Sequence, residues 1–224
     1  MVTTWSSPLA SPCAHGDDPY GARTPLYAGA VTTPSDAVGA ILLTGGASRR
    51  MGRDKSLLIV DGVTLARRTA GLLERVVATA IEVGPGHSGL VATRENPAGE
   101  GPLAAIAAGR ELLREMGSSG AALVVAVDLP FLDEPLVRFL TYYYAPGSVL
   151  PIVEGRSQPL CARWAPEDLD AAADLLARGV RSLRHLELAP DVTLVAEASW
   201  GAVVNAAAFF DVDSPEDLER FGLS

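Results

Sequence analysis

The sequence predicts an α/β fold of three layers, in which helices cover both faces of a doubly wound, mostly parallel sheet. Two observations predict it. Short, almost continuously apolar segments such as "VGAILLT" and "AALVVAVD" are typical of parallel strands that are buried on both faces. They alternate with segments of about 10–15 residues whose apolar side chains recur at helical spacing, which indicates right-handed βαβ units.

These patterns follow one another along most of the chain. Leu65, Leu72, Leu73 and Val76 illustrate the helical spacing, which places apolar side chains on one face. The expected strands cover residues 38–44, 79–84, 121–128, 147–153 and 159–164. The expected helices cover residues 64–80, 101–117, 134–144, 166–179, 181–188 and 212–222.

Proline, glycine and serine mark the ends of two of these helices. Pro102 falls in the first turn of the helix at 101–117, and Gly117 follows its last turn. Ser214 is placed to cap the closing helix, with Pro215 at its first helical position.

The length of 224 residues is sufficient for one sizeable domain, which we expect at residues 37–224. Residues 1–36 are rich in Pro, Ser, Thr, Gly and Ala and show no helical or strand periodicity. They also lack the basic start and apolar core of a secretory signal. We therefore expect a disordered tail ahead of the domain.

Composition excludes several classes of function. Hydrophobic residues make up 48% of the chain and charged residues 20%, which is typical of a soluble globular domain. A net charge of −9 argues against nucleic acid as a partner, because nucleic-acid binding needs a basic face. No apolar run approaches the ~20 residues of a membrane-spanning helix, so no membrane association is expected.

Cysteine usage indicates a reducing compartment. Cys13 and Cys161 lie far apart, match no zinc-site spacing and give no reason to infer a disulfide, so the cytoplasm is the expected location. Cys161 lies within an apolar, strand-like stretch, and we expect it to be a buried structural thiol.

The segment "LLTGGASRRMGRDKSLL", residues 42–58, combines glycines with a cluster of cations: Arg49, Arg50, Arg53 and Lys55. It is neither a P-loop nor a dinucleotide fingerprint, since its glycines have the wrong spacing for both. Glycine lets backbone N–H groups approach a bound anion closely, and the cations neutralise the anion. A phosphate site and a solvated basic turn both fit these residues alone.

Asp128 directly follows a buried strand and precedes Leu129 and Pro130. Ligands of open α/β sheets bind beyond the carboxyl ends of the strands, where both Asp128 and the glycine-rich segment are expected. A carboxylate there can hold Mg²⁺, which prefers oxygen ligands and bridges substrate phosphates. The alternative is an aspartate that only caps the next turn. Together the two features suggest a site for a nucleoside triphosphate with Mg²⁺.

The first of these segments resembles the L-x-G-G-x-x-x-R-M-G-x-D-K signature of the nucleotidyltransferases that include molybdenum cofactor guanylyltransferase (molybdopterin-guanine dinucleotide biosynthesis protein A). Further segments fit the same family in the right order, from about Val38 to Phe221: "RENPAGEGPLAAIAAG", "VAVDLPFL", "EGRSQPLCARW", "GVRSLRHL" and "FFDVDSPEDL". The resemblance implies a Rossmann-like nucleotidyltransferase fold and Mg²⁺-dependent transfer of GMP from GTP to molybdopterin, with release of pyrophosphate.

The resemblance also implies roles for individual residues. Lys55 would contact the triphosphate, Asp128 would hold Mg²⁺, and Arg50 would stabilise the negative charge that develops on phosphorus. The attacking phosphate is already an anion and needs no strong base, so His87 and His185 are weak catalytic candidates. The residues that would line the nucleotide are Leu43, Thr44, Gly45, Gly46, Lys55, Asn96 and Asp128.

On the acceptor side, Arg181 and Arg184 are candidates for binding the pterin phosphate. Gln158 is a candidate for hydrogen bonding to the edge of a ligand through its side-chain amide. A solvated helix face is the alternative for the two arginines. Substrates would be GTP and molybdopterin, and a molybdoenzyme or its chaperone would be a partner that receives the product.

The chain departs from the family pattern at two places. Asn96 stands where relatives usually have an aspartate. This difference affects which nucleobase the site would select. Asp211 and Asp213 replace the asparagines of an N-x-N-T-P-E motif, which affects metal stoichiometry. Asp213 would either add a ligand to the metal opposite Asp128 or only cap the last helix.

Other functions remain open from the sequence alone. Cytidylyl transfer to the same pterin is the nearest, although Gly45-Gly46 and Gln158-Pro159 favour guanine. Nucleotidyl transfer to another small phosphate uses a similar loop. A non-enzymatic adaptor that binds GTP and delivers the cofactor is the third alternative.

Overall fold

The computed structural model describes residues 37–45 and 54–221. Several sequence predictions lie outside these ranges: the tail at 1–36, Cys13, Gly46 and Arg50.

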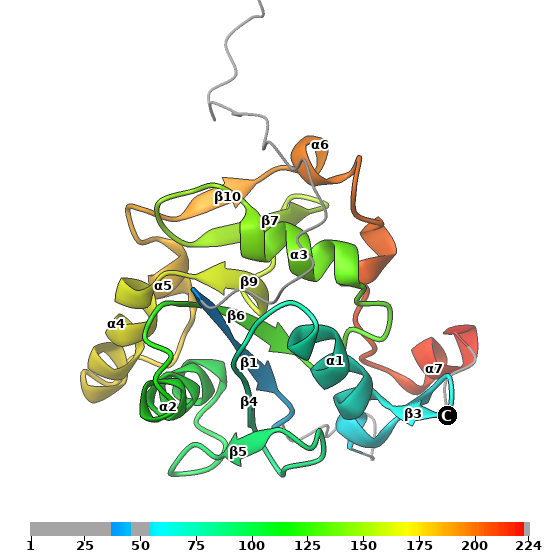
Figure 1. The fold of residues 1–224 in the computed structure, drawn as a ribbon, viewed down its shortest axis with the longest axis horizontal. Helices are drawn as coiled ribbons and strands as arrows, with labels where there is room; N and C mark the ends of the chain where they lie inside the picture. The colour runs from blue at the N-terminus through cyan, green and yellow to red at the C-terminus, as the bar shows by residue number, and fades with distance from the viewer. Residues whose placement is uncertain (1–36, 46–53, 222–224) are drawn as a thin grey trace, which may run out of the picture.

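The described residues build one large mixed sheet, in the order β10-β7-β9-β6-β1-β4-β5, with the short β8 paired to β7 (Figure 1). Strand β1 lies between β4 and β6 and is parallel to both, and β5 continues the parallel part at one edge. Strand β9 runs antiparallel to both of its neighbours. The strands are β1 (Val38–Leu43), β4 (Ala80–Val83), β5 (Val91–Thr93), β6 (Ala121–Ala126), β7 (Val149–Val153), β8 (Arg156–Ser157), β9 (Cys161–Trp164) and β10 (Thr193–Val195).

The central strands are apolar on both faces because helices cover both. In β1, Ala40 and Leu42 belong to one core cluster, whereas Ile41 and Leu43 belong to the other. This alternation follows from the two-residue period of a strand. The predicted three-layer, mostly parallel α/β fold is thereby confirmed.

Two sets of helices form the outer layers (Figure 1). The first core cluster includes side chains of α1 (Leu65–Glu74), α3 (Glu134–Tyr142), α6 (Glu197–Trp200) and α7 (Pro215–Phe221). The second includes side chains of α2 (Pro102–Glu115), α4 (Pro166–Ala177) and α5 (Arg184–Glu187). Three-residue and four-residue 3-10 helices, η1 (Lys55–Leu57) and η2 (Ala206–Phe209), and the hairpin of β2 (Ile59–Val60) and β3 (Val63–Thr64) complete the described elements.

Some predicted boundaries were wrong. The helix expected at 64–80 ends at Glu74, because Val76 and Val77 turn into the core instead, where both are buried. The helix expected at 181–188 is only the four residues of α5. Strand β5 was missed because it lies at the sheet edge with Val91 and Ala92 exposed, which removes the apolar run that identifies a buried strand.

Cys161 is the buried thiol that the sequence predicts. It lies on β9 with 3% of its surface exposed. Burial, with smaller contributions from the charges of Asp128 and Asp133, raises the pKa of this thiol to about 12. Because the thiolate is the nucleophile, Cys161 is inert at neutral pH.

Among residues 37–45 and 54–221, no helix combines the length and the apolar character that crossing a membrane requires.

Candidate active site

The carboxyl ends of β1 and β6 meet at one edge of the sheet. The Val127 N–H donates to the Leu43 carbonyl at 3.0 Å, which extends the pairing of the two strands to their ends. Thr44 and Asp128 follow directly. The glycine-rich segment and the strand-end aspartate therefore leave the sheet side by side, as expected for parallel neighbours.

Lys55 brings the far end of the glycine-rich segment back to this edge. Its ammonium lies 3.2 Å from Asp128 Oδ2 and 2.5 Å from Asp213 Oδ1, and only 15% of its side chain is exposed. Lys55 opens η1, and the Asp54 side chain caps this helix by accepting the Ser56 N–H at 2.9 Å. Lys55 is also the only lysine among the 224 residues.

Asp213 reaches the site through a backbone contact. The Val212 N–H donates to the Asp128 carbonyl at 2.9 Å, so the segment before α7 lies against the end of β6. The helix cap is formed by Ser214, whose hydroxyl accepts the Asp217 N–H at 3.2 Å, as the sequence predicts. The Asp213 carboxylate is thus left free of capping and contacts Lys55.

The charges of this cluster influence one another. Burial alone would lower the pKa of Lys55, but the hydrogen bond to Asp213 and the negative charge of Asp128 outweigh it and raise this pKa. Lys55 is therefore fully cationic at neutral pH. Partial desolvation raises the pKa of Asp211, and the negative charges of Asp213 and Asp128 raise it further. Asp211 thus belongs to the same electrostatic cluster.

The polar groups that begin the glycine-rich segment already have partners. The N–H groups of Thr44 and Gly45 both donate to the Val83 carbonyl, at 3.1 and 3.2 Å. The Thr44 hydroxyl donates to Glu82. Leu43 is buried in the core. The N–H groups of Thr44 and Gly45 are therefore engaged within the sheet.

The remaining predicted residues lie in other parts of the molecule. Asn96 is exposed in the loop between β5 and α2. Arg181 forms an ion pair with Glu100 and donates to the Leu176 carbonyl near the end of α4 at 3.2 Å. The side chain of Gln158 donates to the Arg156 carbonyl at 3.4 Å, and Arg184 is exposed at the start of α5. The described contacts do not bring these four residues to Lys55.

Sequence reasoning missed two residues beside the site. His87 Nδ1 lies 2.7 Å from Ser56 Oγ, next to Lys55, although no histidine was expected near the catalytic motifs. Glu82 accepts the Thr44 hydroxyl from the neighbouring strand. An acidic residue inside the apolar strand "AIEV" was the available signal, because an unpaired buried carboxylate is too costly to occur without partners.

The carboxylates suit a divalent metal ion. Asp128 and Asp213 converge on one ammonium, so their oxygens lie close enough to share a cation. Hard divalent ions prefer such oxygen ligands and take the rest from substrate phosphates and water. Within residues 37–45 and 54–221, no group of three or more His, Cys, Asp or Glu is arranged around a metal position.

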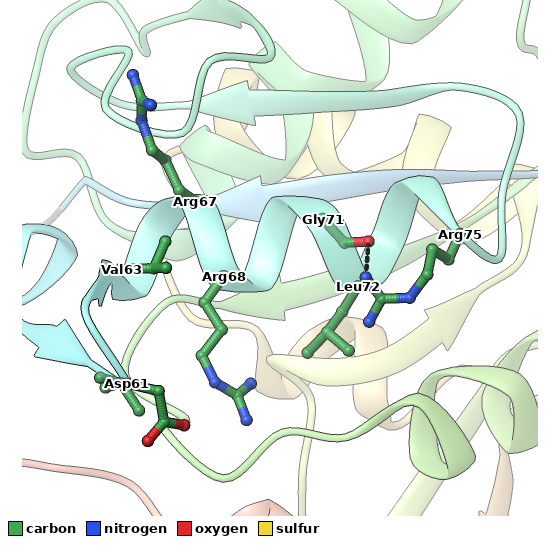
Figure 2. Close-up of a pocket in the computed structure, with 8 residues that line it drawn as sticks. Asp61, Val63, Arg67, Arg68, Gly71, Leu72 and Arg75 are labelled. Atoms are coloured by element: carbon green, nitrogen blue, oxygen red, sulfur yellow. Dashed lines mark hydrogen bonds between the residues drawn. The ribbon is translucent and has the colours of Figure 1, made fainter.

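A hollow of about 300 Å³ is lined by the β2–β3 hairpin and α1 (Figure 2). Two of its arginines, Arg68 and Arg75, bond to neighbouring segments. Arg68 donates to the Leu132 carbonyl at 3.1 Å, and Arg75 pairs with Glu134 at 2.9 Å while donating to the Gly71 carbonyl. Two of the arginines that line the hollow therefore hold α1 against the start of α3, and we assign the hollow no role in catalysis.

A cation and carboxylates gathered where parallel strands end suit an enzyme that handles nucleotide phosphates, and the family and relatives that the chain matches make it a nucleotidyltransferase. Comparison with known proteins specifies the family. The family model described as the MobA-like NTP transferase domain matches residues 40–194, and the chain belongs to this family.

Individual relatives agree with this assignment. The molybdenum cofactor guanylyltransferase of Rhodobacter capsulatus is 32% identical, and the match covers 82% of this chain and 94% of that protein. A protein of Mycolicibacterium paratuberculosis named "Probable molybdenum cofactor guanylyltransferase" is 35% identical over 75% of this chain and 90% of its own. The crystal structure of molybdopterin-guanine dinucleotide biosynthesis protein A from Archaeoglobus fulgidus has the same fold, with a TM-score of 0.66 and 20% identity over 81% of this chain and 95% of that one. Enzymes of this class typically require a divalent metal ion.

Proposed function

We propose that the chain transfers GMP from GTP to the phosphate of molybdopterin, which yields the guanine dinucleotide form of the cofactor and pyrophosphate. The single observation that carries the proposal is the contact of Lys55 with Asp128 and Asp213 at the carboxyl edge of the sheet. The names of the relatives support the choice of GTP and molybdopterin as substrates.

In this reaction an oxygen of the pterin phosphate forms a bond to the α-phosphorus of GTP. The bond from that phosphorus to the oxygen bridging to the β-phosphate breaks, and pyrophosphate leaves with the electron pair. The attacking oxygen is already anionic, so no side chain has to remove a proton. The protein contributes positioning and charge stabilisation.

Lys55 is the proposed contact for the triphosphate. An ammonium carries three donors, of which Asp128 and Asp213 occupy two in the structure, so one is left for a phosphate oxygen. Arg50 is proposed to stabilise the charge on phosphorus. Leu43, Thr44, Gly45, Gly46 and Asn96 are proposed to line the nucleotide, and Gln158, Arg181 and Arg184 the acceptor.

Mg²⁺ is the proposed metal ion, held by Asp128 and by Asp213. When bound, it would neutralise charge on the substrate phosphates. The replacement of a family asparagine by Asp213 gives this chain a second carboxylate at the same ammonium.

Pyrophosphate release tests the proposal. Full-length protein with Mg²⁺ and molybdopterin is expected to release pyrophosphate from GTP and not from CTP, ATP or UTP. Release from CTP instead would replace guanylyl by cytidylyl transfer. Ligand at ~100 times its Kd stabilises the folded protein by about 2.7 kcal/mol, so bound GTP raises the melting temperature. Such a rise without any release of pyrophosphate would indicate an adaptor that binds GTP but does not react with it.

We also propose that residues 37–224 form the single folded domain. Removal of residues 1–36 is then expected to change the melting temperature by less than about 2 °C, because surface changes are usually worth within ~0.5 kcal/mol. Calorimetry of the full-length and shortened chains measures this. A drop of about 5 °C or more would show that the segment packs on the core.

A further inference from the structure

Glu82 is a fully buried carboxylate at the centre of a set of donors. It lies on β4, between β1 and β5, with none of its surface exposed. Oε1 accepts the Thr44 hydroxyl, the Gly86 N–H at 2.7 Å and the His87 N–H at 3.1 Å. Oε2 accepts the Ser88 N–H at 2.8 Å and the Ser88 hydroxyl at 2.5 Å. Glu82 therefore ties the end of β1 to the turn at residues 86–88.

These donors also decide the charge of Glu82. Burial alone would raise its pKa, but the hydrogen bonds from Ser88 and Thr44 outweigh burial and lower it. Glu82 accepts all five of these hydrogen bonds and donates none, so an ionised carboxylate is the form that satisfies every donor. A buried charge solvated only by hydrogen bonds makes the turn conformation highly specific.

The turn also contacts η1, the helix that carries Lys55, through a hydrogen bond between His87 and Ser56. His87 Nδ1 lies 2.7 Å from Ser56 Oγ, and Ser56 is fully buried. The Ser56 hydroxyl donates to Asp54 Oδ1 at 2.7 Å, so the hydrogen between serine and histidine comes from Nδ1. Asp54 and Ser56 flank Lys55 in sequence, and both are held.

Gly84, which lies between β4 and the turn, also packs closely against the end of β1. A Cβ atom on Gly84 would lie 2.0 Å from Thr44 Oγ1 and 2.8 Å from the Gly45 nitrogen. Only glycine fits at this position without a shift of the backbone. Thr44 is therefore packed closely against Gly84, and its hydroxyl is joined to the turn only through Glu82.

We propose that Glu82 and His87 are positioning residues, which hold Thr44 and Lys55, one near each end of the glycine-rich segment, in a fixed relative placement. Neither residue touches the reacting atoms in this scheme. The effect on catalysis rests on the proposed function, whereas the effect on the placement of Lys55 does not.

The single lysine gives a direct readout. In protein labelled with ¹³C-lysine, the ε-CH₂ signal reports only Lys55. Replacement of His87 by alanine removes the contact with Ser56 but keeps the backbone N–H that Glu82 accepts, and the side chain is 31% exposed, so folding is expected to be preserved.

The His87→Ala protein is expected to show a shifted ε-CH₂ signal and a kcat lowered by about 10- to 100-fold, because small displacements of positioned groups cost this much. His87→Asn places an amide donor near the position of Nδ1 and is expected to return the signal and to restore kcat to within about threefold of the original. Glu82→Gln turns an NH₂ group toward donors and is expected to shift the signal as His87→Ala does.

Glu134→Gln is the matched control for Glu82→Gln. Glu134 also accepts hydrogen bonds, from Arg75 and Arg138, but lies on α3 outside the network, and its loss is expected to leave the Lys55 signal unchanged. An unchanged signal in folded His87→Ala protein overturns the proposal, and so does failure of His87→Asn to restore it. If no variant, nor the original protein, releases pyrophosphate, the proposed function fails while the lysine signal still decides the placement of Lys55.

Discussion

Replacement of Asp128 by asparagine is expected to lower Mg²⁺-dependent pyrophosphate release by at least ~1000-fold, because loss of metal-ion stabilisation is worth several kcal/mol. Asp128 is the carboxylate at the end of β6, and its Oδ2 lies 3.2 Å from the Lys55 ammonium. Asparagine keeps the shape of the side chain but removes the charge. Initial rates measured across a range of Mg²⁺ concentrations test this.

Asp174→Asn is the matched control for this change. Asp174 is exposed on α4, and the same loss of one negative charge there is expected to leave the rate unchanged. Undiminished turnover of the Asp128→Asn protein would contradict the assignment and transfer the metal to Asp213 or another ligand. An Asp213→Asn protein, compared at the same Mg²⁺ concentrations, distinguishes these outcomes.

Replacement of Lys55 by alanine is expected to lower turnover by at least ~100-fold, comparable to the loss of one preorganised charge stabiliser. The ammonium is held by Asp128 and Asp213 in the structure, so no reorganisation is needed to place its charge. Without it, the carboxylates of the cluster lose the cation that balances them. Steady-state kinetics with GTP and molybdopterin measure the effect on kcat and KM.

Two further proteins make this experiment specific. Arg178→Ala removes one positive charge from the end of α4, where the side chain is exposed, and is expected to leave turnover unchanged. Lys55→Arg keeps the charge in a larger, planar group, and its partial activity would report how closely the site fits an ammonium. Near-normal turnover of Lys55→Ala would remove this lysine from the mechanism.

The large elements of the fold could be predicted because burial leaves a pattern in the sequence. Strands β1 and β6 are apolar on both faces, and α2 is bounded by Pro102 and Gly117, so their types and approximate positions were correct. Edge and short elements leave no such pattern. Strand β5 is half exposed, and it was missed. The helix at 184–187 spans a single turn, and it was predicted too long.

The sequence by itself determined that the chain has an α/β fold and that Lys55 and Asp128 belong to one edge of its sheet, because strand ends and motif spacing are local properties. The tertiary structure decided which distant residues join them. Asp213 reaches Lys55 because Val212 bonds to the Asp128 carbonyl, and His87 reaches Ser56 because buried Glu82 holds the turn at 86–88. The direction of β9 between β6 and β7 was decided at the same level. Such contacts depend on packing between segments far apart in the chain, which no local periodicity encodes.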